Sequence, residues 1–598
     1  MSFYLSIIAF ALLFTTSAIE NIAITFILFI YFTQNKNNSI PNCISISNNK
    51  IPTILILLWL GITFIFRWRE SPKPIYIADS LGIDIDVFLT ITAIALSAIA
   101  YNSIYRLVYI VKYHVANQPT NQPTNHNLNT RSILYLFVIA TIAITLFSHC
   151  SPIYPFQTWC DPNFFFTVGK SVINGVVPYR DLYEQKGPLL YFIHTLAATI
   201  SYRTFIGVYL IEIIIAWFYL LISYKTISLF CINRKILIIC APLCMIAYSS
   251  IAFYMGDTAE EFCLPCIAYA LFIGLKTIRN KQSISFSEAF FVGVTAACVL
   301  WIKFSLCGFY LGWIGYLLYV YFKCKWGIRI IPTFIYAIIG LITLSIPILI
   351  YFSYHDALYT MIETYFINNS TLYGDTSNSI CTLLKNIFNS SVCNFVWLLI
   401  IAGIFVSKKH NCLIYFLSTL CCLLSAIYIR ISFVYYTFIL VAFAPVGISI
   451  FCNFSKRAIY LIVALFIMSV FSNSMLYTPK ENLAQHKFEQ IINLEHNPTL
   501  LNYQCRDDGF YTYSGIVPIN RFFGMLNIPH PEMKFNQDSI VSNGLTTFII
   551  TQRLIGMDEE SRFPKYEKIA EAPHYGEKWE ADVIYSLYKL KTDTTVAE

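Results

Sequence analysis

Residues Cys160–Leu190 read CDPNFFFTVGKSVINGVVPYRDLYEQKGPLL, a stretch that holds two Asp, one Glu, two Lys and one Arg. This density of charge is unusual in a chain of 598 residues that is 57% hydrophobic and only 12% charged, with a mean hydropathy of +0.61. A soluble domain carries about 25% charged residues. The composition therefore indicates a membrane protein in which this stretch is a water-exposed loop between apolar segments.

Apolar runs recur on both sides of the loop, and runs of ~17–25 residues are long enough to cross a hydrocarbon core of ~30 Å as helices. The runs do not alternate as the strands of a membrane barrel do. The sequence therefore predicts an all-α polytopic membrane protein with about 14 transmembrane helices. Residues 3–33 are expected to form one tilted helix or a hairpin, and further spans are placed near 51–66, 85–111, 132–148, 204–223, 236–253, 258–277, 286–302, 305–322, 330–352, 394–406, 412–429, 432–452 and 458–474.

Basic residues in the short connections predict which side of the membrane each loop faces. The connections rich in Lys and Arg all fall on one side, which is therefore expected to be the cytoplasm. They lie at 112–131, 225–235, 276–281, 323–329, 408–409 and 456–457. Arg67, Arg69 and Lys73 depart from this pattern. The loops 149–203 and 353–393 and the chain after residue 475 are placed on the extracytoplasmic side.

Composition divides the chain into four parts. The polar, Pro-interrupted segment NQPTNQPTNHNLNT lies in a cytoplasmic linker (116–131) that joins an N-terminal transmembrane appendage (1–115) to the core (132–475). From about residue 480 the composition becomes that of a soluble protein, and TLLNYQC, TTFIITQ and DVIYSLYKL have the pattern of short strands. We therefore expect 476–598 to form a small extracytoplasmic α/β domain.

Ionisable residues outside the basic connections gather on the predicted outer side. They are Asp161, Asp181, Glu184 and Lys186 in the first outer loop, the acids of YMGDTAEEFCLP (254–265), Lys303 and Arg430. A charged side chain at the bilayer centre costs ~2.5–3.5 kcal/mol on insertion scales, so such residues usually face a cavity or take part in function. We expect these groups to meet over one outward-facing cavity, although a lysine that only reaches to the interface is the alternative for Lys303.

Carboxylates and ammonium groups around one cavity suit the transfer of a group from a phosphate to a hydroxyl. A carboxylate can accept the proton of the attacking hydroxyl, and Lys or Arg can neutralise the charge that grows on a departing phosphate. Lys186 precedes Gly187-Pro188 and an apolar segment, which suits the head group of a polyprenyl phosphate. The net charge of +7 is spread over the connections, so no nucleic-acid partner is predicted.

The first outer loop resembles that of the GT-C class of integral-membrane glycosyltransferases, which includes the bacterial aminoarabinose transferase acting on lipid A and the protein O-mannosyltransferases. That class has an acidic residue after the first core span, a G-x-x-P-Y-like stretch and a Y-F-E-K-P-P-L-L-Y-W-like entry to the next helix. The counterpart here is WCDPNFFFTVGKSVINGVVPYRDLYEQKGPLLYFI, and the resemblance covers about 130–475. It implies that Asp161 is the catalytic base and that Lys186 contacts the lipid phosphate.

Later segments extend the resemblance. GDTAEEF, with Asp257, Glu260 and Glu261, resembles a second acidic cluster of the class, whose members are candidate contacts of substrate or metal. Lys303 resembles a Lys that follows a small-residue helix in the class. The class implies an inverting transfer from a polyprenyl-phosphate sugar. It is also compatible with a divalent ion held by Asp161 with Asp257 or Glu260, although the spacing of these residues in the sequence does not itself predict a metal site.

Two motifs depart from the class. Gln185-Lys186-Gly187-Pro188 replaces Glu-Lys-Pro-Pro, so the metal or donor contact of that Glu has no direct counterpart, and Glu184 is displaced from it by one residue. RISFVYYTF (430–438) has Tyr435 and Tyr436 where a His-Tyr motif is common. The appendage before residue 115 has no counterpart.

Each candidate also has a structural interpretation. Asp161 before Pro162 is typical of a helix start, and Asp257 of a helix cap. Asp181 and Glu184 are as well suited to stabilising the loop as to contacting the donor, and Tyr179 to packing as to stacking on a sugar. His194 is predicted to be a buried, hydrogen-bonded residue and not a ligand.

The sequence thus predicts a bacterial inner-membrane glycosyltransferase, hexosyl or pentosyl, of the cell envelope. A sugar moves from polyprenyl phosphate to a hydroxyl of an extracytoplasmic glycan, lipid or protein, with Asp161 as base and with Lys186, Lys303 and Arg430 at the phosphate. A glycan polymerase or ligase is an alternative, although outer arginines are sparse. A lipid or glycan transporter is another, but it predicts repeated halves that the chain lacks. A scaffold without activity is the third.

Overall fold

The computed structural model describes residues 128–591, apart from 232–234, 373–395, 429–432, short breaks between 454 and 473, residue 529, 555–561 and 574–582. The predicted N-terminal appendage (1–115), residues 116–127 of the linker, Arg430 and most of the span at 458–474 lie outside the described residues.

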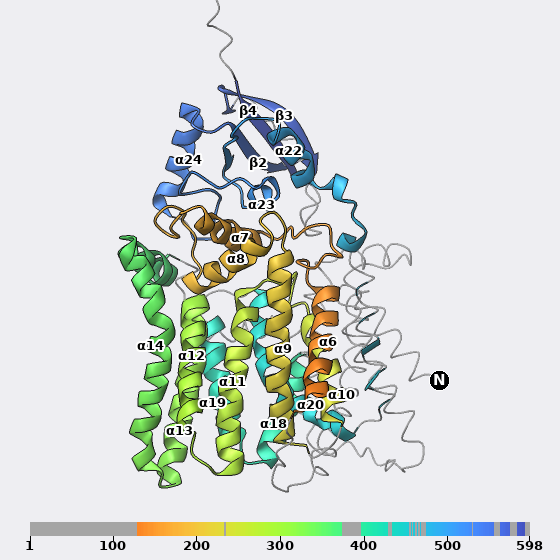
Figure 1. Ribbon diagram of the computed structural model, residues 1–598, viewed down its shortest axis with the longest axis vertical. Helices are drawn as coiled ribbons and strands as arrows, with labels where there is room; N and C mark the ends of the chain where they lie inside the picture. Colours follow the sequence, from red (N-terminus) through yellow and green to blue (C-terminus); the bar gives the residue numbers. More distant parts are fainter. Residues whose placement is uncertain are drawn as a thin grey trace, which may run out of the picture.

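A bundle of apolar helices forms the larger part of the molecule (Figure 1). Its helices are α6 (Thr130–Phe147), α9 (Ile206–Ser228), α10 (Ile236–Tyr248), α11 (Ala259–Asn280), α12 (Phe286–Lys303), α13 (Gly308–Lys323), α14 (Ile330–Tyr354), α18 (Val396–Lys409), α19 (Leu413–Tyr428) and α20 (Ala444–Ile448). The 3-10 segment η1 (Phe304–Cys307) continues α12. Two further 3-10 segments, η4 (Val434–Phe443) and η5 (Ser449–Asn453), precede and follow α20.

Six of the described segments are long and apolar enough to cross a membrane, by length and composition. They are Thr130–Phe147, Ile206–Ser228, Ala259–Asn280, Phe286–Lys323, Gly327–Tyr354 and Val434–Cys452. Five of them lie close to single predicted spans, and Phe286–Lys323 covers the two spans predicted at 286–302 and 305–322. The prediction of a polytopic helical membrane protein is therefore confirmed for this part of the chain. The total of about 14 stays a prediction.

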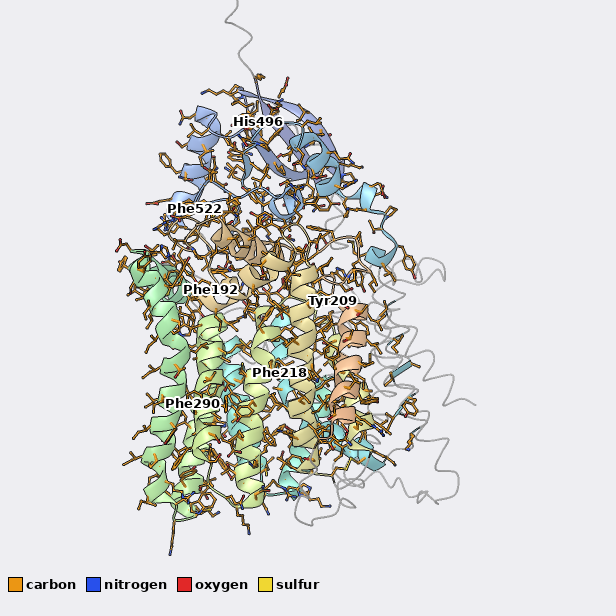
Figure 2. The ribbon with its side chains drawn as sticks, in the orientation of Figure 1. Phe192, Tyr209, Phe218, Phe290, His496 and Phe522 are labelled. Carbon is orange, nitrogen blue, oxygen red and sulfur yellow. A yellow bond between two sulfur atoms is a disulfide. The ribbon has the colours of Figure 1, made fainter. Side chains whose placement is uncertain are left out.

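The outer surface of the bundle is apolar, as contact with lipid requires. Large hydrophobic side chains project from it, among them Phe218 on α9, which Figure 2 labels, and Leu311 on α13, which is 72% exposed. Exposed apolar surface of this extent marks contact with a membrane or with another protein, and the apolar length of the helices favours a membrane.

Close helix packing depends on small residues. A Cβ atom added at Gly293 on α12 would lie 1.8 Å from the carbonyl oxygen of Ala337, and one at Gly340 on α14 would lie 2.0 Å from that of Phe290. These two glycines therefore let α12 and α14 approach backbone to backbone, a common device between helices in membranes.

Two helices of the segment 149–203, which the sequence predicts as the first outer loop, lie across one end of the bundle, where Figure 1 shows them beneath the C-terminal residues. They are α7 (Cys160–Ile173) and α8 (Pro188–Ile200). Pro188 begins α8, where its missing N–H has no helical partner to lose. We call this end of the bundle the site end.

Residues 484–590, called here the C-terminal unit, form a four-stranded sheet with helices. The strands are β1 (Leu500–Asn502), β2 (Phe548–Leu554), β3 (Tyr566–Pro573) and β4 (Val583–Leu590), in the order β1-β2-β4-β3, with β1 parallel to β2 and the other pairs antiparallel. The helices are α22 (Ala484–Ile492), α23 (Phe510–Ser514) and α24 (Pro531–Asn543). β1 and β4 lie in two of the segments predicted as strands, and β2 begins in the third and runs two residues past its end. β3 was not predicted because it is a charged edge strand with little alternation.

The C-terminal unit contacts α7 through buried hydrogen bonds. The hydroxyl of Thr167 donates a hydrogen bond to Asp507 Oδ2 (2.7 Å), and Lys170 donates to the carbonyl of Tyr511. Lys170 and Asp507 are both fully buried. The helix that carries Asp161 is therefore held between the C-terminal unit and the bundle.

At the opposite end of the bundle, Cys231 and Cys452 form a disulfide across 221 residues of sequence. The Lys and Arg pattern predicts that this end is cytoplasmic, where thiols are normally reduced. The side of the membrane that each end faces therefore stays a prediction.

Candidate active site

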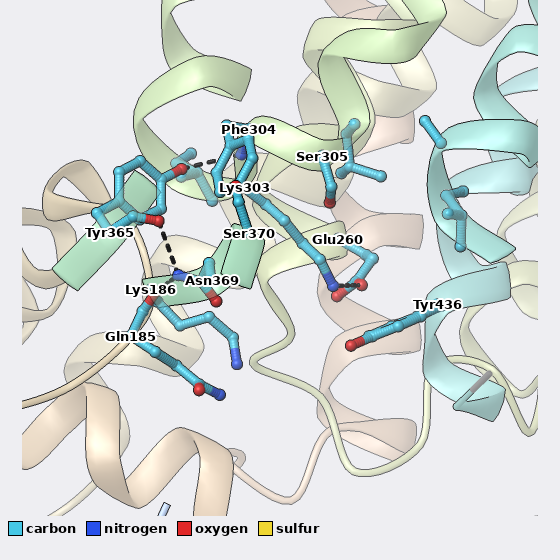
Figure 3. Close-up of a pocket in the computed structure, with 14 residues that line it drawn as sticks. Gln185, Lys186, Glu260, Lys303, Phe304, Ser305, Tyr365, Asn369, Ser370 and Tyr436 are labelled. Carbon is cyan, nitrogen blue, oxygen red and sulfur yellow. Dashed lines mark hydrogen bonds and ion pairs between the residues drawn. The ribbon is translucent and has the colours of Figure 1, made fainter. Parts of the chain in front are cut away.

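A cavity of about 340 Å³ opens at the site end of the bundle, among residues from distant parts of the sequence (Figure 3). Lys186 reaches it from the loop before α8, Glu260 from the first turn of α11 and Lys303 from the end of α12. The remaining lining residues are Gln185, Ile302, Phe304, Ser305, Leu306, Tyr365, Asn369, Ser370, Ala426, Ile427 and Tyr436. The cavity thus combines two ammonium groups with an apolar wall.

Lys186 is held by hydrogen bonds of its own backbone. Its N–H lies 2.8 Å from Glu184 Oε2 and 2.9 Å from the hydroxyl oxygen of Tyr191, and its carbonyl accepts from the hydroxyl of Tyr179 at 2.6 Å. Its Nζ atom lies 3.4 Å from Asp161 Oδ2 and 5.1 Å from the ring centre of Phe165. The loop therefore fixes where the ammonium group enters the cavity.

Gly187 brings this loop against α12. Its N–H donates to the carbonyl of Ile302 at 3.1 Å, and a Cβ atom at this position would lie 2.0 Å from the carbonyl oxygen of Trp301. No side chain fits there without moving the backbone. The sequence gives only a departure from Glu-Lys-Pro-Pro at this point, whereas the structure shows a physical requirement for glycine.

Glu184, Asp181 and Tyr179 shape the loop and do not line the cavity. Burial raises the pKa of the Glu184 carboxyl, whose Oε2 accepts from the Lys186 N–H and from the Tyr191 hydroxyl. Partial burial alone would raise the pKa of Asp181, but the ion pair with Arg180 (2.7 Å) and the hydrogen bond from the Val177 N–H lower it overall.

Lys303 forms an ion pair with Glu260, whose side chain is almost fully buried. The Nζ atom of Lys303 also lies 3.6 Å from the ring centre of Tyr436, which favours the cation electrostatically. Figure 3 shows Lys303, Glu260 and Tyr436 directed toward one another on one wall of the cavity, with Lys186 across from them.

Asp161 lies in the first turn of α7, and the N-cap residue of that helix is Trp159, which makes no side-chain cap hydrogen bond. The Oδ2 atom of Asp161 faces Lys186 Nζ at 3.4 Å and accepts from the hydroxyl of Tyr435 at 3.4 Å. Asp161 adjoins the cavity through these two neighbours and is not one of its lining residues.

Two adjacent tyrosines thus contact the two ends of the site: Tyr435 contacts Asp161, and Tyr436 contacts Lys303. The sequence singles them out only as the residues that replace a His-Tyr motif. Their position in RISFVYYTF was the available signal for a role in the site.

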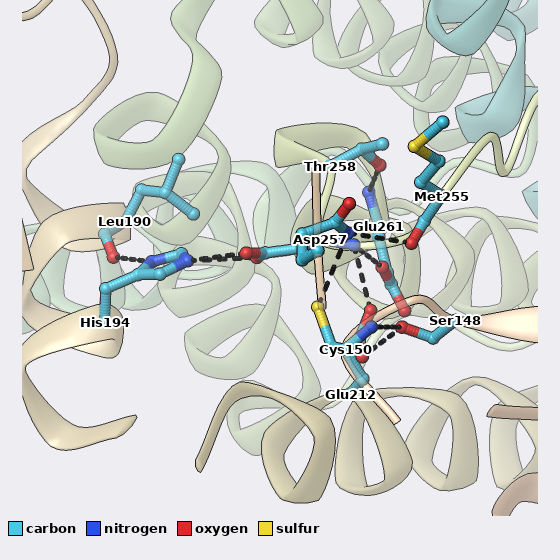
Figure 4. Close-up of polar contacts among 10 residues, drawn as sticks. Ser148, Cys150, Leu190, His194, Glu212, Met255, Asp257, Thr258 and Glu261 are labelled. Atoms are coloured by element: carbon cyan, nitrogen blue, oxygen red, sulfur yellow. Dashed lines mark hydrogen bonds and ion pairs between the residues drawn. The ribbon is translucent and has the colours of Figure 1, made fainter. Parts of the chain in front are cut away.

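Asp257 and Glu261 are fully buried and do not line the cavity. Asp257 pairs with His194 Nε2 at 3.0 Å, and Glu261 Oε2 accepts from the Asp257 N–H at 3.1 Å (Figure 4). His194 is buried and hydrogen-bonded, as predicted. Of the three acids in GDTAEEF, only Glu260 reaches the cavity.

The donor set does not fit a divalent cation. Across the described part of 128–591, no group of three or more His, Cys, Asp or Glu side chains is placed to hold a metal ion. Asp161, Glu260 and Asp257 face Lys186, Lys303 and His194 instead. We assign no step to a metal.

Comparison with known proteins gives distant likenesses among solved structures. No family model and no curated protein matches the chain. Among solved structures, the crystal structure of ArnT from Cupriavidus metallidurans bound to undecaprenyl phosphate is similar, with 10% identity, a TM-score of 0.43, and coverage of 77% of this chain and 98% of that chain. A likeness of this degree decides neither the fold nor the function of this chain.

Proposed function

We propose that this chain is a membrane glycosyltransferase that moves a sugar from a polyprenyl-phosphate donor to a hydroxyl of an extracytoplasmic glycan, lipid or protein. One observation carries the proposal: two ammonium groups from segments far apart in sequence, Lys186 and Lys303, line one cavity at an end of an apolar bundle, and each lies beside a carboxylate.

The two lysines form the phosphate subsite. A phosphate held between Lys186 and Lys303 replaces their contacts with Asp161 and Glu260 by charge-assisted hydrogen bonds. Ile302, Leu306 and Ile427 supply apolar wall beside it, which suits a lipid attached to that phosphate. Arg430, outside the described residues, is a further phosphate ligand in this proposal.

Asp161 is the general base. When the donor phosphate binds Lys186, the Asp161 carboxylate loses its ion pair with Lys186 but retains the hydrogen bond from the Tyr435 hydroxyl. It can then accept a proton. The acceptor oxygen then attacks the anomeric carbon, and the bond between that carbon and the phosphate oxygen breaks. The electron pair leaves with the polyprenyl phosphate, the proton passes to Asp161, and the configuration at the anomeric carbon inverts. Lys186 and Lys303 neutralise the charge on the leaving phosphate.

The test is a transfer assay on the purified chain with polyprenyl-phosphate sugars of several head groups. Asp161→Asn keeps the size of the side chain but cannot accept the proton. Asp356→Asn is the matched control, because Asp356 is exposed and its φ of 51° suits Asn equally well. Release of polyprenyl phosphate by wild type and by the control, with loss in Asp161→Asn, supports the proposal. An Asp161→Asn variant as active as wild type overturns the assignment of the base, and failure of wild type to consume any donor of the panel overturns the function.

A further inference from the structure

A fully buried pair, His194 and Asp257, lies next to the proposed site without lining its cavity. His194 belongs to α8, and Asp257 ends the connection between α10 and α11. The Nε2 atom of His194 lies 3.0 Å from Asp257 Oδ1 and 3.1 Å from Oδ2, and its Nδ1 atom lies 2.8 Å from the carbonyl oxygen of Leu190 (Figure 4). Both ring nitrogens therefore face oxygen atoms.

This geometry fixes a proton within the pair. The Leu190 carbonyl can only accept, so Nδ1 carries a hydrogen. Nε2 then either carries a second hydrogen and faces a carboxylate, or accepts a hydrogen from a protonated Asp257. In both cases the pair as a whole is neutral, which is the state that full burial favours.

The backbone around Asp257 is held in an uncommon conformation. Tyr254 (φ 61°), Gly256 (φ 85°) and Asp257 (φ 58°) all lie in the left-handed region within four residues. The Asp257 N–H donates to Glu212 Oε1 (2.9 Å) and to Glu261 Oε2 (3.1 Å). Such a backbone persists only where its surroundings determine it, and the contact with His194 is part of those surroundings.

Three segments that carry the proposed catalytic groups meet at this pair. α8 begins two residues after Lys186, so His194 fixes the helix onto which the Lys186 loop leads. Thr258, next to Asp257, is the N-cap of α11 and precedes Glu260. Phe165, one turn beyond Asp161 on α7, packs against the His194 ring with centres 5.7 Å apart.

We infer that His194 and Asp257 are positioning residues of the site, which act through Lys186, Glu260 and Asp161 and do not contact the substrate. The inference rests on the proposed function for its role in catalysis. Its structural part, the tie between α8 and the start of α11, is independent of that function and is measured separately.

Two variants separate the contact from the charge. In Asp257→Asn the amide donates a hydrogen bond to Nε2 of a neutral His194, so the contact survives without the proton of the pair. The double variant His194→Ala/Asp257→Ala removes the contact without leaving one partner as an unpaired buried charge, which the single variant His194→Ala does. His410→Ala is the matched control, because His410 is a buried histidine between α18 and α19 at the far end of the bundle.

In the transfer assay we expect Asp257→Asn and His410→Ala to keep kcat and KM within about threefold of wild type. The double variant is expected to lose about 10–100-fold in kcat with a smaller change in donor KM, because misplacement of reacting groups by about 1 Å costs rate on that scale. Asp257→Ala alone is expected to lose as much as the double variant, since both residues act through one contact. Equal losses in Asp257→Asn and in the double variant would show that Asp257 itself acts on the substrate and would overturn the inference.

Hydrogen–deuterium exchange tests the structural part without any substrate. In the double variant, amides of 176–187 and of 254–260 are expected to exchange faster together, whereas Asp257→Asn leaves both at wild-type rates. Faster exchange confined to 254–260 would contradict the inference that the His194–Asp257 contact holds α8 against the start of α11. If wild type proves inactive with every donor while exchange behaves as expected, the proposed function fails and the pairing of the two segments stands.

Discussion

The Nζ atom of Lys186 lies 3.4 Å from Oδ2 of Asp161, although 25 positions separate the two residues. Each side chain is only 14% exposed, so solvent screens this attraction less than it screens a surface pair. In the proposed reaction, Lys186 binds the donor phosphate, and before the donor binds it forms an ion pair with the base, Asp161. Proton acceptance by Asp161 is thereby coupled to donor binding.

Removal of either ammonium group is expected to weaken donor binding and catalysis. Lys186→Gln should raise the donor KM and lower kcat/KM about 10–100-fold, because a charge-assisted contact to phosphate is lost. Lys323→Gln, an exposed lysine at the last turn of α13, is the matched control and should have wild-type kinetics. A Lys186→Gln variant with unchanged KM and kcat would remove Lys186 from the phosphate subsite.

Lys303 needs a paired substitution, because Lys303→Gln alone leaves the Glu260 carboxylate buried without its cation. The double variant Lys303→Gln/Glu260→Gln keeps a neutral contact. We expect it to melt within a few degrees of wild type in detergent while kcat/KM falls about 10–100-fold. Recovery of activity along with stability would show that the ion pair only supports the fold.

The two tyrosines are expected to respond differently to loss of the hydroxyl. Tyr435→Phe removes the hydrogen bond to Asp161 and should lower kcat about three- to tenfold, the scale of one hydrogen bond of ordinary strength, because this bond is long at 3.4 Å. Tyr436→Phe keeps the aromatic ring beside Lys303 Nζ and should leave kcat nearly unchanged, whereas Tyr436→Leu removes the ring and its interaction with the cation. Steady-state rates of the three variants check this order, and equal rates for Tyr435→Phe and wild type would contradict it.

Much of the fold follows from the sequence because a helix that crosses a membrane needs a long apolar run. Such a run remains recognisable even when it contains a few polar residues. Lys303 even marks the break between two spans, and the structure places η1 directly after it. The site is predictable only to the level of which end of the bundle holds it. Asp257 and Glu260 are three residues apart, yet Thr258 caps α11 between them, so one pairs with His194 and the other reaches the cavity. The pairing of His194 with Asp257 depends on how α8 packs, which no local pattern records.

Glu184 predicts a pH dependence of stability. Burial raises the pKa of its carboxyl, so the folded chain binds a proton that the unfolded chain releases at lower pH. The stabilisation is therefore complete below the ordinary pKa of a glutamate, about 4.3, and is lost as pH rises through the folded value. Glu184→Gln should remove this decline and keep the acceptor for the Lys186 N–H. Melting temperatures in detergent from pH 5 to 8 test it, and parallel curves for wild type and variant would contradict it.

Gly187→Ala is expected to move the Lys186 loop. The new Cβ atom would meet the backbone carbonyl of Trp301 at 2.0 Å, which no rotamer change relieves. We expect a loss of about 1–3 kcal/mol in the free energy of unfolding, the scale of overpacking, and a loss of at least about tenfold in kcat/KM, since Lys186 shifts relative to Asp161. Gly315→Ala on α13 is the control, because a Cβ there meets nothing within 4 Å and alanine favours a helix. Equal activity of the two variants would mean that the close approach of Gly187 to α12 does not set the position of Lys186.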